Sequence, residues 1–128
     1  MTTDRVRPVL LAFGVSQLAL AVFIVVAPGA FADSLGSFGA RNDHLARDIA
    51  TLYLALGVVL VAAASRPAWR PAAVCAAGVQ YAAHALNHAW DIGDSDPGWI
   101  GPADLALLVA GAVLLGWLWR AVRTGSFS

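Results

Sequence analysis

The residues of this sequence best suited to chemistry gather in the segment 80–91. Its polar members follow a spacing of four, four and three residues: Gln80, His84, His88 and Asp91. On an α-helix this spacing puts the four side chains on one face. The third histidine of the chain, His44, is followed four residues later by Asp48. A second helix is therefore expected to present an imidazole and a carboxylate together.

Two imidazoles at positions i and i+4 of a helix can chelate one metal ion. Ala85 stands where the zinc-protease form of this motif has a glutamate, so protease chemistry is not indicated. The side chains predict a site for a transition metal (Zn, Fe or Cu). A metal bound there could support redox or hydrolytic chemistry. The predicted ligands are His44, Asp48, His84 and His88. The predicted supporting residues are Asp104, Gln80, Asn87, Asp91 and Arg47.

Three other roles for these side chains stay open at this point. Haem b could lie between His44 and either His84 or His88, because its two ligands must come from facing helices. A histidine beside an aspartate could relay protons for a quinone or another lipophilic small molecule. The same residues could instead bridge helices in a non-catalytic accessory subunit, within a homo-oligomer or a larger membrane complex. The sequence does not decide whether the protein is an enzyme.

Composition indicates the elements that position these residues. Hydrophobic residues make up 59% of the 128-residue chain and charged residues 12%, which is far from the soluble average. The apolar residues form blocks at about 8–28, 45–64, 68–90 and 102–121, each close to the length that spans a bilayer. We therefore expect one all-α domain, a four-helix transmembrane bundle. The formal net charge of +0 argues against a nucleic-acid partner.

The first apolar block is expected to stay in the chain as a span. Basic residues precede it and Ala30-Phe31-Ala32 follows it, as in a cleaved signal peptide, but the block is longer than the usual apolar region of such signals. Gln17 lies near its middle. An unpaired amide in hydrocarbon is costly, so Gln17 is expected to face the bundle and form a hydrogen bond there. Asn42 or Asp43 is the expected N-cap of the second span.

The arginines predict the orientation in the membrane. Six of them fall on the side that holds both chain ends and the 66–70 connection, and only two fall on the other side. Because cytoplasmic loops are enriched in basic residues, both termini are expected in the cytoplasm of a multi-pass protein of the cell (plasma) membrane. The histidines would then lie toward the extracytoplasmic end of the bundle.

Two segments carry a resemblance to known proteins. An Asn-x-His-Leu-x-Arg-Asp pattern opens the second block at 42–48, and a His-x-x-x-His pattern ends the third at 84–88. In these features the chain resembles a group of small four-span actinobacterial membrane proteins that are broadly DoxX-like. The resemblance implies the four-helix membrane fold. The wider DoxX family is tied to thiosulfate–quinone redox chemistry, but this chain shows too little of that family's pattern to imply the same role.

Overall fold

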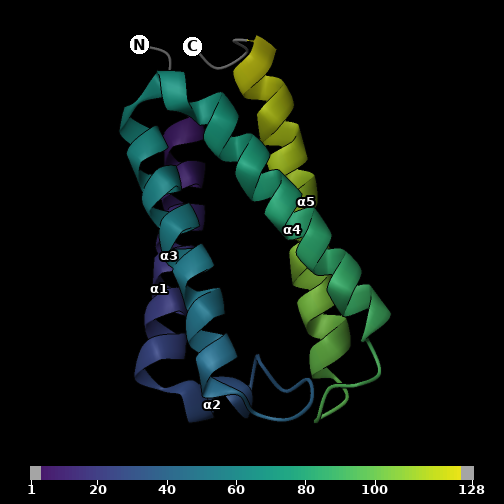
Figure 1. The fold of residues 1–128 in the computed structure, drawn as a ribbon. Helices are drawn as coiled ribbons and strands as arrows, with labels where there is room; N and C mark the ends of the chain where they lie inside the picture. Colours follow the sequence, from purple (N-terminus) through teal and green to yellow (C-terminus); the bar gives the residue numbers. More distant parts are fainter. Residues whose placement is uncertain (1–3, 125–128) are drawn as a thin grey trace.

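The computed structural model describes residues 4–124, and these fold into helices (Figure 1). The elements are α1 (Val6–Val26), the short α2 (Pro28–Ala32), α3 (Asp43–Ser65), the 3-10 turn η1 (Pro67–Trp69), α4 (Arg70–Trp90) and α5 (Ile100–Thr124). Apart from one isolated bridge, residues 4–124 contain no β-structure. The all-α expectation is confirmed. By length and composition, α1, α3 and α5 are apolar enough to cross a membrane.

Helices α1 and α3 pack closely because glycines face each other where they cross. A Cβ atom built on Gly57 would lie 2.9 Å from the carbonyl oxygen of Gly14. A Cβ built on Gly14 would lie 2.7 Å from a methyl carbon of Val61. Small residues at such positions let two backbones approach in an apolar environment. The α1–α3 pair therefore forms one half of the molecule.

Helices α4 and α5 form the other half. Gly111 of α5 leaves room for the ring of Tyr81 on α4, since a Cβ there would lie 2.6 Å from the ring. Figure 1 shows the two pairs close together at the end where α1 begins and α5 finishes, and diverging toward the loops. We call the first the closed end and the second the open end.

The closed end is held by an apolar core to which all four long helices contribute. Its buried members are Val6, Leu10, Leu60, Ala63, Ala64, Ala73, Val74, Ala77, Leu115 and Leu118. The second core cluster, toward the open end, contains only Ala21, Ile24, Ala50 and Tyr53, which all belong to α1 and α3. Side-chain packing between the two halves is thus concentrated at the closed end.

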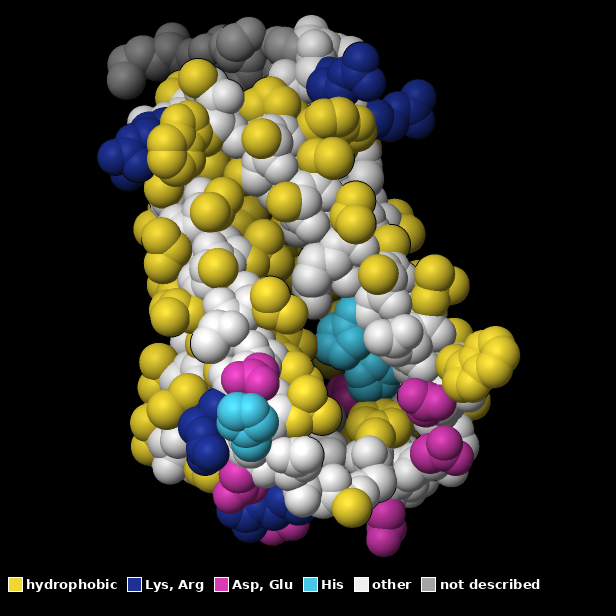
Figure 2. Space-filling model, viewed as in Figure 1, with side chains coloured by type: hydrophobic (Ala, Val, Ile, Leu, Met, Phe, Trp, Pro, Cys, Tyr) yellow, Lys and Arg dark blue, Asp and Glu magenta, His cyan; other side chains and the backbone are white. Residues whose placement is uncertain are grey.

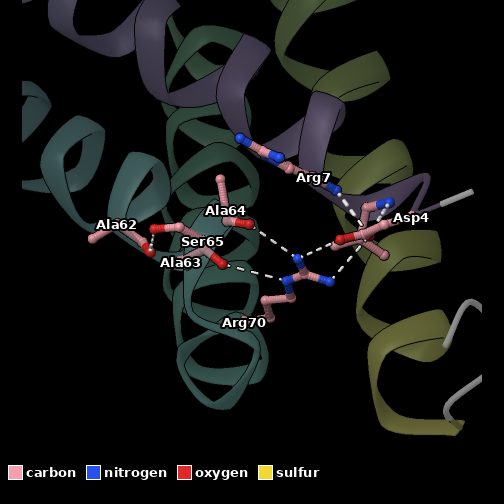
Figure 3. Close-up of polar contacts among 8 residues, drawn as sticks. Asp4, Arg7, Ala62, Ala63, Ala64, Ser65 and Arg70 are labelled. Carbon is pink, nitrogen blue, oxygen red and sulfur yellow. Dashed lines mark hydrogen bonds and ion pairs between the residues drawn. The ribbon is translucent and has the colours of Figure 1, made fainter.

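An arginine reinforces the closed end (Figure 3). The guanidinium of Arg70, at the start of α4, pairs with the carboxylate of Asp4 at 2.6 Å. It also donates to the carbonyl oxygens of Ala63 and Ala64 at 3.3 and 3.0 Å. These carbonyls lie in the last turn of α3, where a cation is favourable. Arg70 therefore ties together the chain before α1, the end of α3 and the start of α4.

At the open end the two interhelical loops touch each other. The backbone N–H of Asp96 donates to the carbonyl of Ser37 at 3.2 Å, beside the bridge between Phe38 and Ser95. Ser95 is buried, and its hydroxyl accepts a hydrogen bond from the backbone N–H of Gly101 at 2.9 Å. The expected cap is also present here, as Asn42 Oδ1 accepts from the backbone N–H of Leu45 at 3.0 Å. The hydrogen bond from Asp96 to Ser37 and the bridge between Phe38 and Ser95 join the two halves across the loops.

Candidate functional site

A cavity of about 670 Å³ lies between the two halves toward the open end. Figure 2 shows it as a hollow on one face of the molecule, with histidine side chains inside it. Most of its walls are apolar, including Leu20, Leu107 and Leu108. Its aromatic and polar members include Phe13, Gln17, Phe31, Phe38, Tyr53, Gln80, Tyr81, His84, His88 and Asp104. A mainly apolar pocket with a few converging polar groups is typical of small-molecule sites.

The two histidines of α4 point toward each other inside this cavity. The Nε2 atoms of His84 and His88 are 3.1 Å apart, within hydrogen-bond distance. The Nδ1 atom of His84 lies 3.5 Å from the hydroxyl of Tyr53 on α3, at the limit for a hydrogen bond. Phe38, from the loop before α3, sets its ring edge-to-face with His88 at a centroid distance of 4.7 Å. The histidine pair of α4 is thus contacted by two other segments of the chain, α3 and the loop before it.

A second polar contact lies deeper in the cavity, between α1 and α4. Gln17 is 4% exposed, and its side-chain N–H donates to the hydroxyl of Tyr81 at 2.9 Å. The expectation that Gln17 faces the bundle and forms a hydrogen bond is confirmed. Its carbonyl oxygen Oε1 is buried and has no hydrogen-bond partner among the described residues. That oxygen can still accept a hydrogen bond.

Other cavity groups are also left without partners. The Oε1 atom of Gln80 and the Nδ1 atom of His88 are buried without hydrogen bonds in the described part of the chain. Asp104 of α5 lies close enough to His88 to interact electrostatically, but no ion pair within residues 4–124 includes it. Buried polar groups are usually hydrogen-bonded. Several unpartnered atoms around one cavity therefore point to binding rather than to support of the fold.

The structure does not bring His44 and Asp48 to this cavity. They pair with each other at 3.4 Å, and their side chains are 82% and 63% exposed. Neither lines the cavity. Within residues 4–124, no group of three or more His, Cys, Asp or Glu side chains lies close enough to hold a metal. The four-ligand metal site remains a prediction, and of its four members only His84 and His88 line the cavity.

The predicted supporting residues fall into two groups. Gln80 and Asp104 line the cavity with the histidine pair. Arg47 instead lines a smaller apolar hollow of about 230 Å³ between α1 and α3. Asn87 is exposed, and Asp91 is the C-cap residue that follows α4. The face of α4 that turns to the cavity therefore carries Gln80, Tyr81, His84 and His88, and it excludes Asn87 and Asp91.

The site also contains two tyrosines, Tyr53 and Tyr81, that were not among the predicted site residues. Tyr81 precedes His84 by three residues, a spacing that already predicts a shared helix face. Tyr53 belongs to the apolar cluster with Ala21 and Ile24, and its hydroxyl also lies at the cavity beside His84. Nothing in the sequence indicated Phe38, because it enters the site from an irregular loop.

The chain matches no family model, no curated protein and no solved structure. The resemblance to DoxX-like proteins therefore stays a prediction. Any functional conclusion rests on the geometry of the cavity.

Proposed function

We propose that this protein is a four-span membrane protein that binds a lipophilic small molecule in the cavity between its two helix pairs. The observation that carries the proposal is the cavity itself. It is about 670 Å³ in volume, within the usual range for small ligands. Its lining is mostly apolar and aromatic, and it also contains a histidine pair and unpartnered amide oxygens. Such a site holds an apolar body and orients it through a few polar contacts.

The fourth span in this proposal is α4. It has 21 residues, enough to cross a bilayer core. Its polar side chains Gln80, His84 and His88 line the cavity, so they need not face lipid. Val79 and Leu86, elsewhere on the helix, are 65% and 72% exposed, as expected for residues that contact acyl chains. These polar side chains explain why α4 is less apolar than α1, α3 and α5.

With four spans, both ends of the chain lie on one side of the membrane. The basic residues that would share this side are Arg5, Arg7, Arg66, Arg70, Arg120 and Arg123. Only Arg41 and Arg47 would lie opposite. The positive-inside rule then makes the closed end cytoplasmic and the open end extracytoplasmic. Reporter fusions to the C-terminus and to the 91–99 loop should report opposite sides.

Binding can be tested by photolabelling in bilayers. The probe is dodecanol that carries a diazirine in its chain, and labelled positions are read by mass spectrometry. Residues that line the cavity should be labelled more strongly than outward-facing residues such as Val113. Ala110→Trp, at an exposed cavity-lining position of α5, should remove most of this labelling. Ala106→Trp, one turn away and not in the lining, is the matched control.

Two outcomes would contradict the proposal. In the first, cavity residues are labelled no more than the lipid-facing surface. In the second, Ala110→Trp and Ala106→Trp reduce cavity labelling equally.

A second candidate function, metal binding, is favoured by one observation. The Nε2 atoms of His84 and His88 lie 3.1 Å apart, near the separation of two imidazole ligands whose bonds to Zn²⁺ are about 2.0–2.1 Å long. The remaining ligands would come from water or from the bound molecule. Purified protein should then retain Zn²⁺ or Cu²⁺ at about one ion per chain and lose it on His84→Ala or His88→Ala. Protein without retained metal excludes this candidate and leaves the lipophile proposal standing.

A further inference from the structure

Three acceptor groups that line the cavity lack hydrogen-bond or ion-pair partners among residues 4–124. Gln17 Oε1 and Gln80 Oε1 are buried acceptors without partners in the described chain, and Gln17 is 4% exposed. The carboxylate of Asp104 adds a third acceptor, with a formal negative charge and no ion-pair partner within residues 4–124. A ligand that supplied only carbonyl or carboxylate oxygens would leave all three unpaired. The cavity therefore favours a ligand that brings hydrogen-bond donors.

The cationic groups that line the cavity already have partners. The guanidinium of Arg41 donates twice to the carboxylate of Asp43, at 2.6 and 2.9 Å, so this pair adds no net charge. The Nε2···Nε2 contact between His84 and His88 requires one nitrogen without a proton. The two imidazoles together are therefore neutral or carry one charge at most. Neither the guanidinium of Arg41 nor a doubly charged histidine pair is therefore available to an anionic ligand.

Aromatic rings complete the pattern. Phe13 and Tyr81 stack edge-to-face at a centroid distance of 5.4 Å on the cavity wall. Phe31 and Phe38 line the wall from the α2 side. The face of an aromatic ring carries negative electrostatic potential and attracts organic cations, most strongly where water is excluded. Rings, amide oxygens and a carboxylate together suit a cation with an apolar body.

We propose that the ligand of this cavity is a lipophilic amine, bound as its ammonium ion. The ammonium lies beside Asp104, its N–H groups donate to this carboxylate and to the unpartnered amide oxygens of the cavity, and its apolar body lies along the aromatic wall. This inference rests on the proposed function, since it assigns the chemical class of the ligand in the same cavity.

The test compares three photoreactive probes that share one chain and differ in head group: dodecylammonium, dodecanol and laurate, each with the same diazirine. The full chain is placed in bilayers of zwitterionic phosphatidylcholine, and cavity labelling is divided by labelling of Val113 to correct for membrane content. A charge-assisted contact predicts about tenfold more cavity labelling by the ammonium than by the alcohol. Laurate should label the cavity least.

The matched variants are Asp104→Asn and Asp94→Asn. Asp94 is an exposed loop carboxylate outside the cavity lining. Asp104→Asn should lower labelling by the ammonium probe to the level of the alcohol, and Asp94→Asn should leave it unchanged. If Asp104→Asn fails to fold, competition in the unmodified protein serves instead. Unlabelled dodecylammonium should then displace the ammonium probe at lower concentration than unlabelled dodecanol does.

The outcomes separate the two proposals. The three probes could label the cavity equally, with all of this labelling blocked by Ala110→Trp. That result would overturn the amine inference and support the lipophile proposal. An ammonium preference that survives Asp104→Asn would also overturn the inference, because the carboxylate is its basis. Labelling of the cavity by none of the probes would overturn the proposed function itself.

Discussion

The two ends of this molecule hold their helices together by different means. At the closed end Leu10, Leu60 and Leu115 are 0% exposed and bring three helices into direct apolar contact, with Val74 of α4 beside them. At the open end the halves diverge around the cavity, and the apolar cluster there joins only α1 and α3. One end is packed like a protein interior, and the other is lined by polar groups without partners.

The difference indicates that the closed end contributes most to the stability of the fold and that the open end is the place for ligand binding. Unpartnered polar atoms such as Gln17 Oε1 cost free energy that a well-packed region elsewhere must offset. Local unfolding is easiest where buried apolar contacts are few. We therefore expect substitutions at the closed end to change the free energy of unfolding, and substitutions at the open end to change ligand binding with little effect on folding.

The largest expected effect comes from Leu60→Ala at the closed end. Leu60 is 0% exposed, and truncation of a fully buried leucine costs about 2–5 kcal/mol of folding free energy. The matched change, Leu107→Ala, removes a cavity-lining leucine that is 71% exposed; it should cost about 0.5 kcal/mol or less. Reversible unfolding in mixed detergent micelles measures both. Similar losses of folding free energy in the two variants would show that the closed end contributes no more to stability than the open end does.

A smaller effect is expected from Asp4→Asn, and it should depend on pH. The hydrogen bonds from Arg70 hold the pKa of Asp4 below its ordinary value of 3.8. The carboxylate therefore stabilises the fold above that ordinary value, and the stabilisation is lost as the pH falls through the lowered pKa. Asp4 is partly exposed, so Asp4→Asn should cost up to about 1 kcal/mol at neutral pH.

Unfolding curves from neutral to acidic pH check this prediction. The difference between the natural chain and Asp4→Asn should shrink once the pH is below the ordinary pKa of the carboxyl group. Asp94→Asn, which alters an exposed loop acid, provides the control for general charge effects. A difference that stayed constant down to the lowest pH would show that Arg70 does not act through the ionised carboxylate of Asp4.

The smallest expected effect comes from Tyr81→Phe in the cavity. The variant removes the hydroxyl that accepts from Gln17 at 2.9 Å, and hydrogen bonds between membrane helices are worth about 0.6 kcal/mol on average. Unfolding should therefore change little, while the distribution of photolabel near Phe13 should shift because Gln17 is free to turn toward the ligand. A loss comparable to that of Leu60→Ala would place Tyr81 in the folding core instead.

Much of the fold could be predicted from the sequence, because long apolar blocks bounded by Pro, Gly and Asn leave few alternatives. The cap at Asn42 and the inward position of Gln17 followed from the same physical rules, and both are confirmed. The four-residue spacing of His84 and His88 correctly placed them on one face. Local periodicity was sufficient for each of these features.

What could not be predicted depends on contacts between distant segments. His44 and Asp48 have the right spacing to share a site with α4, but their helix turns that face outward. The rotation of α3 is set by the glycine contact with α1 and by Tyr53 packing, neither of which a spacing rule contains. The divergence of the two halves, and hence the cavity, likewise follows from the short η1 connection and the placement of the apolar core.

Arg70 fixes the start of α4 at the closed end, so any tilt of α4 relative to α3 would turn about this point. Helix α4 is 21 residues long, which corresponds to about 32 Å at 1.5 Å per residue. A rotation of about 5° at the pivot would therefore move its far end by about 3 Å. The hydrogen bond between Asp96 and Ser37 restrains that far end. A substitution near Arg70 should thus change the width of the cavity at the opposite end of the molecule without any contact with the ligand.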